Sequence, residues 1–421
     1  MARGGLIHNS HFRRLWLGQT VSLFGTQVTF LALPSVAILQ MHASVFQVGV
    51  LQALQFLPFL PLGLLAGTWI DRRHRRPIMI GADIGRMLVL ASIPVAFLFH
   101  SLTFFQLYAV AAIAGVFNVF SQVAYQAHLP DLVGPEELVD GNAKLQLSSS
   151  ASAIGGPVLA GFLIDLVGPA MAITADAVSF LVSAVAVAAI SKPEQLNSGP
   201  SRRRSLSKEM REGLSFVSST PILRITSLNA ATVNFGNYLA YTVLVVFAYR
   251  TLHLTPAMVG TAFGLGSLGW LIGALTASRL SGKLGLGRTL ALANILMGVG
   301  ELTFPAALLG NPVAMLTMSH LVVDIGWPTY NIAQQGMRQA ITPAHLQGRM
   351  NGITRTVTNG AIPLASFAGG ALGSIIGIVP TLVLGGTITL LSSTMLASGG
   401  VLAVREPPDP TDAAERAQEP R

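Results

Sequence analysis

The sequence predicts an all-α membrane protein of twelve transmembrane helices, organised as two parallel repeats of six helices. Only 10% of the 421 residues are charged and 51% are apolar, whereas soluble domains carry about 25% charged residues. Apolar stretches also recur along the whole chain, each long enough to cross a bilayer as a helix of roughly 20 residues. Finally, the two halves of the chain resemble each other. The composition argues against a water-soluble enzyme of this length.

Twelve spans follow one another along the chain. The first apolar run is too long for a cleaved signal peptide and eleven more follow it, so we interpret it as a span. Proline and glycine inside the runs are compatible with membrane helices, which tolerate both. The spans are expected at residues 14–40, 46–70, 77–99, 104–127, 142–167, 169–190, 221–249, 256–280, 288–309, 312–337, 350–376 and 379–404.

Basic residues predict which ends of the spans face the cytoplasm, because cytoplasmic loops collect lysine and arginine. With the N-terminus inside, Arg250 is the one basic residue expected outside, and Arg86 and Arg355 fall within spans. We therefore expect a multi-pass protein of the cell inner (plasma) membrane with both termini in the cytoplasm. The net charge of +8 is then a topology signal, and no nucleic-acid partner is expected.

The longest polar stretch divides the chain. We expect an N-terminal six-helix half at 1–190, a cytoplasmic connecting loop at 191–219, a C-terminal six-helix half at 220–404 and a disordered tail at 405–421. The loop is interpreted as a connector on anionic lipid headgroups, with a regulatory or partner site as the alternative. Its amphipathic helix has an apolar face formed by Leu206, Met210, Leu214 and Val217.

The two halves match at a nearly constant spacing. Phe24-Gly25 corresponds to Phe235-Gly236, and Gly168 corresponds to Gly377. Further matches pair Arg13 with Arg224, Gln126 and Pro130 with Gln339 and Pro343, Asn142 with Asn351, and Gly161 with Gly370. Because six spans is an even number, both copies enter the membrane in the same orientation. Parallel repeats of this kind place a binding site at their interface near mid-membrane.

A short charged loop joins the second and third spans. It reads Gly63-Leu-Leu-Ala-Gly67-Thr-Trp-Ile-Asp71-Arg72-Arg73-His74-Arg75-Arg76-Pro77. A carboxylate beside four arginines at a helix junction can form ion pairs or release them. The alternative is that the arginines are simple cytoplasmic anchors. The counterpart in the second half keeps Arg279, Lys283 and Arg288 but has Ser281 in place of Asp71.

This loop resembles the loop motif of the major facilitator superfamily, made of glycine, aspartate and paired basic residues. The resemblance implies the major facilitator fold and a gate latch that locks the two halves in the outward-open state. Asp71 would then pair across the interface of the halves, with Arg355 as its candidate partner. The implied gating residues are Gly67, Asp71, Arg72, Arg75, Arg76 and Arg355.

The fifth span carries a second motif, Gly155-Gly156-Pro157-Val-Leu-Ala160-Gly161. It is similar to the Gly-Pro-x-x-Gly-Gly signature of antiporter branches of the superfamily, with Ala160 in place of one glycine. The resemblance assigns Gly156, Pro157 and Gly161 to an antiporter-type helix and favours export. Close packing by small residues is the alternative.

Two more segments look like the macrolide-efflux and siderophore-exporter branch, a drug:proton antiporter branch of the same superfamily. They are Phe12 to Gly25 and the phrase Asp176-Ala-Val-Ser-Phe180, and the resemblance covers residues 12–404. Members of the branch often carry an acidic residue after the glycine of the first span, where this chain has Thr26. This departure argues against a proton-carrying role for the first span.

Polar side chains inside spans are costly in hydrocarbon and are therefore functional candidates. They form stripes on spans one, four, seven and ten, which line the cavity in the superfamily that the chain resembles. Interhelical hydrogen bonds with a packing role are the alternative. These uncharged groups suit a bulky, weakly polar or monocationic compound. The cavity candidates are Gln19, Ser22, Thr26, Asn118, Gln122, Tyr125, Asn234, Asn237, Tyr238, Tyr241, Trp327 and Asn331.

Four titratable side chains inside spans are candidates for proton coupling. Asp324 lies about midway along the tenth span, and His320 lies one turn away on the same face, so the two can exchange a proton. A static pair that serves only the fold is the alternative. Glu301 in the ninth span is the runner-up, and Asp176 in the sixth span follows.

Other chemistry finds no support in the sequence. Cysteine is absent, which excludes disulfides, thiolate nucleophiles and cysteine-ligated metals. No P-loop, H-E-x-x-H or nucleophile elbow occurs, so we expect no cofactor, no metal and no enzymatic activity. Gly264-Leu-Gly266-Ser-Leu-Gly269 matches a dinucleotide fingerprint, but no strand precedes it, and we interpret it as helix packing. Asp83 and Arg86 are interpreted as a structural ion pair.

The sequence therefore predicts a monomeric, proton-coupled secondary exporter. As an antiporter it would move an amphiphilic small molecule, such as a drug, macrolide, siderophore or natural product, by alternating access, and so confer drug resistance. Its expected partners are the small-molecule substrate, protons and the lipid bilayer. Uptake symport of a sugar or organic ion on the same fold is the alternative, and a non-transporting polytopic membrane protein is the distant one.

Overall fold

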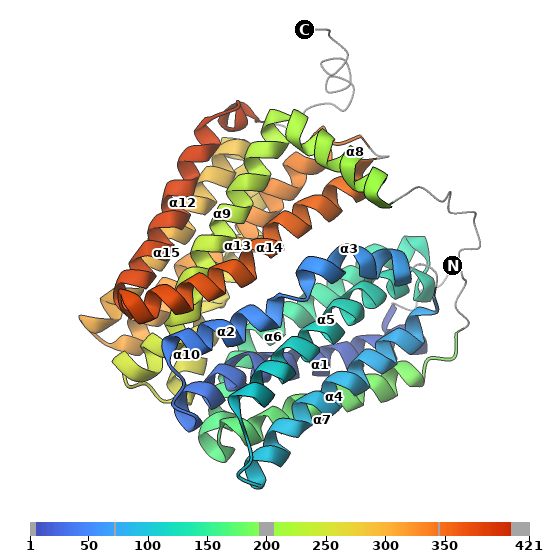
Figure 1. The fold of residues 1–421 in the computed structure, drawn as a ribbon. Helices are drawn as coiled ribbons and strands as arrows, with labels where there is room; N and C mark the ends of the chain where they lie inside the picture. Colours follow the sequence, from blue (N-terminus) through green and yellow to red (C-terminus); the bar gives the residue numbers. More distant parts are fainter. Residues whose placement is uncertain (1–5, 71–72, 193–205, 344–345, 406–421) are drawn as a thin grey trace. The chain divides into compact units, whose positions relative to one another are not determined.

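The structure is a computed structural model that describes residues 6–70, 73–192, 206–343 and 346–405. Within these ranges the regular secondary structure is helical and no strand occurs, which confirms the predicted all-α class (Figure 1). The chain divides into two compact units. The first contains Met1–Gly199 and Val245–Gly264, and the second contains Pro200–Leu244 and Leu265–Arg421.

The first unit is built from long helices around an apolar core that includes Phe12, Leu15 and Ile70. Its first helix continues directly into a π-helical turn, η2, and a second such turn, η4, precedes α10. The elements are η1 (Leu6–His8), α1 (Ser10–Ser35), η2 (Val36–Gln40), α2 (Val45–Phe56), α3 (Phe59–Ile70), α4 (Arg75–Leu98), α5 (Phe104–Leu132), η3 (Pro135–Glu137), α6 (Leu138–Val167), α7 (Pro169–Ala188), η4 (Phe247–Thr251) and α10 (Pro256–Gly266).

The second unit has its own core, which includes Leu290, Met297 and Met337. The predicted connector helix is present as α8, and its Val217 is buried in this core while Leu214 is exposed. The elements are α8 (Leu206–Ser219), α9 (Pro221–Val246), α11 (Leu268–Leu284), α12 (Leu286–Leu302), η5 (Phe304–Leu308), α13 (Pro312–Ile341), α14 (Gln347–Ile375), α15 (Ile378–Ser392), η7 (Ser393–Ala397) and η8 (Val401–Ala403).

Helices occupy all twelve predicted span positions in the described residues. Ten helical stretches there are long and apolar enough to cross a membrane. The other two predicted spans correspond to α13 and α14, which are 30 and 29 residues long but carry more polar side chains. Since a helix rises about 1.5 Å per residue, both are long enough to cross the hydrocarbon core.

Two of the spans are broken where the sequence predicts continuous helices. The second span divides at Leu57–Pro58 into α2 and α3, because a proline has no N–H to donate and its ring crowds the preceding turn. Gly115 of α5 lies against this break, where a Cβ would be 3.1 Å from the Pro58 ring. The eighth span divides at Ser267 into α10 and α11. The breaks let neighbouring helices approach closely.

The internal repeat is visible in the backbone geometry of each half. The π-helical turns Val36–Gln40 and Phe247–Thr251 are 211 residues apart, the same spacing as that between Gly25 and Gly236. Each turn is followed two residues later by a histidine with a φ of 52°, His42 and His253. The same uncommon backbone conformation at corresponding positions shows that the repeat extends to local structure.

The two compact units do not divide at the connecting loop alone. Residues 245–264 follow the loop in sequence, yet they pack with the first unit. A Cβ on Gly161 of α6 would lie 2.9 Å from the Cα of Ala257, and one on Gly260 would lie 3.0 Å from the Cα of Gly161. The Asp165 carboxylate also accepts a hydrogen bond from the Ala257 N–H, at 3.1 Å. Small residues thus join α6 to α10.

Basic side chains gather at one end of the first unit. Arg14 donates to the carbonyl oxygen of Ala189, the residue that follows α7, and the Arg76 Nε donates to that of Val187 in the last turn of α7, at 3.2 Å. Arg75, at the start of α4, forms an ion pair with Asp131 near the end of α5. Cations are favourable at a helix C-terminus, where carbonyl groups lack partners. These arginines therefore hold helix ends together.

Candidate functional site

A pocket of about 160 Å³ lies inside the second unit. It is enclosed by α9, α13 and α14, and its wall combines aromatic rings with uncharged amides and a hydroxyl. An empty apolar cavity of about this size holds one benzene ring, so the pocket admits a group of single-ring size. Its lining residues are Ala230, Val233, Asn234, Tyr238, Trp327, Tyr330, Asn331, Gln334, Thr358, Asn359 and Ile362.

Some polar groups of this pocket are held in place by the protein. The Asn234 amide donates to the carbonyl oxygen of Thr358 at 3.1 Å, and the Gln334 amide donates to that of Thr226 at 3.1 Å. The Tyr330 hydroxyl donates to Asn229 at 2.6 Å. These bonds tie α9 to α13 and α14 and orient Asn234, Tyr330 and Gln334 in the pocket wall.

Other polar groups of the pocket are available to hydrogen-bond a ligand. The side chains of Trp327, Asn331 and Asn359 make no hydrogen bond to the described part of the chain. A buried amide without a partner is costly, whereas one facing a pocket can bind a ligand. The pocket therefore offers amide donors and acceptors together with an indole N–H.

The structure brings four of the predicted cavity residues together in this pocket: Asn234, Tyr238, Trp327 and Asn331. Tyr241 lies beside Tyr238, with ring centroids 6.4 Å apart. Asn237 is used differently, because its amide donates to the Glu301 carboxylate at 2.8 Å. The seventh-span stripe thus serves both the pocket and a buried carboxyl.

Four lining residues with polar groups were not predicted from the sequence: Tyr330, Gln334, Thr358 and Asn359. The first two follow Trp327 and Asn331 by one turn, so helical spacing could have included them. The other two, Thr358 and Asn359, lie on the eleventh span, which carries several polar side chains in its first half. A search for polar groups on that span would have found them.

The predicted cavity residues of the first unit lie on α1 and α5. Thr26 is exposed and Gln19 half-buried, whereas Ser22 is buried. Ser22 belongs to the stripe of Gly18 and Gly25, which packs against α7, so it departs from the shared face that the spacing predicted. On α5, Asn118 and Tyr125 are half-buried and Gln122 is exposed.

The predicted proton pair is adjacent in space. The Nε2 of His320 lies 3.6 Å from a carboxylate oxygen of Asp324, and both side chains are about one-seventh exposed. Gly266 and Gly269 flank the break before α11, and Cβ atoms there would lie 2.6 Å from the Cβ of His320 and 3.1 Å from that of Asp324. Because these glycines lack a side chain, His320 and Asp324 can pack closely against the helix break.

Glu301 is the most deeply buried of the four proton-coupling candidates, with no exposed surface. One carboxylate oxygen accepts from the Asn237 amide, and the other accepts from the Thr389 hydroxyl at 2.7 Å. Both partners are uncharged. The carboxyl therefore joins α9, α12 and α15 without a counter-ion in the described residues.

Asp176 lies in the buried interface of α1 and α7, 1% exposed. It accepts from the Ser179 hydroxyl at 3.0 Å. A Cβ on Gly25 would lie 2.6 Å from the Asp176 carboxylate, so the glycine of the Phe24-Gly25 motif makes room for these groups. Figure 1 shows the two helices side by side.

The predicted ion pair of Asp83 and Arg86 is confirmed. Arg86 also donates to Ser121 of α5 at 2.8 Å and lies over the Phe180 ring of α7, 4.0 Å from its centroid. Ser183 of α7 donates to the other Asp83 oxygen at 2.7 Å. The buried charges thus link α4, α5 and α7.

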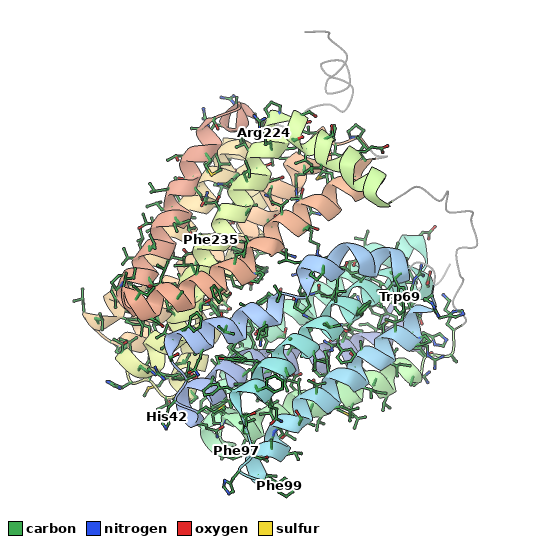
Figure 2. All side chains as sticks on the ribbon, viewed as in Figure 1. His42, Trp69, Phe97, Phe99, Arg224 and Phe235 are labelled. Carbon is green, nitrogen blue, oxygen red and sulfur yellow. The ribbon has the colours of Figure 1, made fainter. Side chains whose placement is uncertain are left out.

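The predicted gating loop is partly visible. Asp71 and Arg72 lie outside the described residues, Gly67 lies in α3, and Arg355 is exposed on α14. Arg75 and Arg76 bind helix ends, as described above. Arg73 lies 5.7 Å from the centroid of the Trp69 ring, in the last turn of α3. In Figure 2, Trp69 and His42 are labelled at opposite ends of the first unit.

The helix motif of the fifth span packs closely on two neighbours. A Cβ on Gly156 would lie 2.5 Å from the side chain of Gln27 on α1. Gly161 faces α10, as described above, and the Pro157 carbonyl faces Gly260. The dinucleotide-like glycines behave similarly, since Gly264 packs on Val158 and Gly266 and Gly269 pack on α13. This confirms helix packing for the latter motif.

A repeated bundle of membrane-spanning helices with a polar pocket inside one unit defines a polytopic membrane transporter. The chain belongs to the Major Facilitator Superfamily, whose sequence profile matches residues 15–365 and 226–421. This confirms the family that the loop and helix motifs predicted.

Relatives and solved structures agree with this assignment. The chain is 27% identical to the multidrug efflux pump Tap of Mycolicibacterium fortuitum, over 90% of this chain and 91% of that one. It is 23% identical to macrolide efflux protein A of Streptococcus pyogenes, over 90% and 93%. A bacterial homologue of the iron transporter ferroportin has the same fold, with 18% identity, coverage of 92% and 98%, and a TM-score of 0.74.

Proposed function

We propose that the protein is a proton-coupled exporter of an amphiphilic small molecule. It would act as a monomer in the plasma membrane with both termini in the cytoplasm, and exchange protons for substrate by alternating access. The observation that carries the proposal is the uncharged pocket of α9, α13 and α14, with its uncommitted Asn331, Asn359 and Trp327. Similarity to a multidrug pump and a macrolide efflux protein supports the direction of transport.

The pocket favours a weakly polar or monocationic substrate over a polyanion. Aromatic rings bind apolar and cationic groups through their faces, and amides satisfy the few polar atoms of an amphiphile. No charged side chain is among the residues that line it. An anionic substrate would therefore lose its hydration without gaining a counter-ion.

Asp324 is proposed as the residue that couples the proton gradient to the pocket, with His320 as its relay. The two side chains are 3.6 Å apart and share a helix with Trp327 and Asn331. Proton exchange at Asp324 changes the charge one turn from Trp327. The coupling charge would then lie one turn from a residue of the pocket.

Substitution of Asp324 tests the coupling. In everted vesicles energised to an acidic interior, the wild-type protein is expected to accumulate ethidium or a labelled macrolide, and collapse of the pH gradient should abolish uptake. Asp324→Asn keeps the size of the side chain but removes its titration, so gradient-dependent uptake should be lost. Undiminished pH-dependent uptake by this variant would remove Asp324 from the mechanism and leave the fold intact.

Substitution of Asn331 tests the pocket. Asn331→Leu removes one uncommitted amide, and a hydrogen bond to a neutral group contributes about 0.5–1.5 kcal/mol. The apparent KM for the transported probe should therefore rise up to about tenfold. Gln335→Leu is the matched control, because Gln335 is one turn away, exposed, and not among the lining residues. Equal effects of the two variants would refute binding in this pocket.

A further inference from the structure

We propose that Glu301 is a second proton-binding site, and that α9 transmits its protonation state to the pocket through Asn237. The inference rests on the proposed function, in which protons drive export. It assigns to α12 a role beyond the coupling proposed for Asp324. The geometry points to it through three features: burial without a counter-ion, partners that tolerate both protonation states, and a direct connection to a pocket helix.

The first feature is the absence of a counter-ion. Glu301 is fully buried, and its partners in the described residues are the neutral Asn237 and Thr389. An ionised carboxylate in such a place is costly, so the group gains from binding a proton. These two partners are not among the charged or titratable side chains that lie on α12 itself and on the helices around it. Those side chains are Tyr238, Tyr241, Arg279, Lys283, Arg288, His320, Asp324, Tyr330 and Arg338.

Comparison of the two halves strengthens this point. In the first half, Gly25 makes room for Ser179, which binds the Asp176 carboxylate. In the second half, Gly236 makes room for Thr389, which binds Glu301. In both halves a buried carboxyl therefore lies beside a hydroxyl and a glycine of the repeat, although the carboxyl comes from α7 in the first half and from α12 in the second.

The compensating charges, however, do not recur. Asp176 has Arg86 within electrostatic range, and Arg86 is paired with Asp83. In the second half, 211 positions later, Met297 corresponds to Arg86 and Asn294 corresponds to Asp83. The second half thus has a buried carboxyl beside Thr389 but lacks both charges of the Asp83–Arg86 pair.

The second feature is that Asn237 and Thr389 can hydrogen-bond to Glu301 in both its ionised and its protonated state. When Glu301 is ionised, the Thr389 hydroxyl donates to it. When Glu301 takes up a proton, its new O–H can donate to the Thr389 oxygen, and the threonine hydroxyl can turn to a carbonyl of its own helix, as threonine commonly does. The Asn237 amide keeps donating to the other oxygen. Neither state leaves a buried polar atom without a partner.

The third feature is the connection to the pocket. Asn237 lies between Asn234 and Tyr238 on α9, and both of these line the pocket. A hydrogen bond to a charged acceptor is roughly twice as strong as one to a neutral acceptor. Protonation of Glu301 therefore weakens its hydrogen bond with Asn237. The weaker bond allows α9 to shift the positions of Asn234 and Tyr238 in the pocket. This gives a physical route from the proton to the substrate.

The experiment measures the environment of the pocket and the protonation state of the carboxyl separately as the pH changes. It uses the full chain in lipid nanodiscs. Trp327 is made the sole tryptophan by Trp16→Phe, Trp69→Phe and Trp270→Phe, so that its fluorescence reports the pocket. Infrared difference spectra report the carbonyl band of a protonated carboxylic acid. In this background both signals should show a pH transition, and Glu301→Gln, which keeps the size and hydrogen bonds, should remove the Glu301 part of both.

Asn237→Leu separates binding from transmission. It should leave the infrared band of the Glu301 carboxylic acid in place while the Trp327 transition disappears. Asp176→Asn is the matched control from the other half and should leave the Trp327 transition unchanged. Persistence of both transitions in Glu301→Gln would overturn the proposal, and so would an unchanged Trp327 transition in Asn237→Leu.

The outcome does not depend on a transport assay. If vesicle uptake shows no gradient dependence while these transitions behave as expected, the proposed export fails and the Glu301 site stands. If uptake depends on the gradient and Glu301→Gln changes neither signal, the Glu301 site fails and the export stands.

Discussion

Replacement of Arg86 by methionine is expected to destabilise the protein by about 3–5 kcal/mol. Arg86 and Asp83 are 8% and 3% exposed, and the arginine is the charge that compensates the aspartate. Without it, Asp83 keeps only the hydroxyl of Ser183, and an unpaired charge in a low-dielectric interior is strongly unfavourable. The measurement is thermal or denaturant unfolding of the purified protein in detergent, followed by intrinsic fluorescence.

The second half of the chain supplies the control for this prediction. Asn294 and Met297 stand at the positions that correspond to Asp83 and Arg86, and Ser392 there corresponds to Ser183. The Asn294 amide lies 3.0 Å from the Ser392 hydroxyl, so a neutral pair fills the same place. The double variant Asp83→Asn with Arg86→Met should therefore be more stable than Arg86→Met alone. A double variant as unstable as the single one would contradict the charge argument.

Replacement of Gly161 by valine is expected to disrupt the packing of α6 on α10. A Cβ at this position would lie 2.9 Å from the Ala257 Cα and 3.0 Å from the Pro256 carbonyl carbon. These are backbone atoms, so the helices must move apart. Overpacking of this kind costs about 1–3 kcal/mol. We expect a lower melting temperature and loss of vesicle uptake.

Gly155→Ala is the matched control on the same helix. Its Cβ would meet only the rim of the Phe24 ring, at 3.2 Å, and a ring edge can shift more easily than a backbone. Alanine also favours the helix by up to about 1 kcal/mol over glycine. Stability and uptake should therefore stay close to those of the wild type. Equal losses of stability and uptake in both variants would contradict this prediction, because the effect would then not depend on contact with α10.

Much of the functional pattern was predictable because helical spacing fixes which side chains share a face. Asn234, Tyr238, Trp327 and Asn331 follow from this rule, and they meet in one pocket. The same rule groups Ser22 with Gln19 and Thr26, yet Ser22 is buried whereas Thr26 is exposed. Periodicity identifies a shared face, but it does not say what the face meets. That depends on the neighbouring helix.

The sequence by itself determined the helical membrane class, the twelve spans, the internal repeat and the family, because hydrophobicity, charge placement and spacing are local properties of the chain. Only the tertiary structure decided what surrounds the buried carboxyl of Glu301. Asp83, Asp176 and Glu301 are all acidic residues in apolar spans. Asp83 meets Arg86, whereas Glu301 meets only Asn237 and Thr389 in the described residues. Arg86 lies three residues from Asp83 on the same helix, so helical spacing could predict that pair. Asn237 and Thr389 come from helices far from Glu301 in sequence, so their contacts depend on packing.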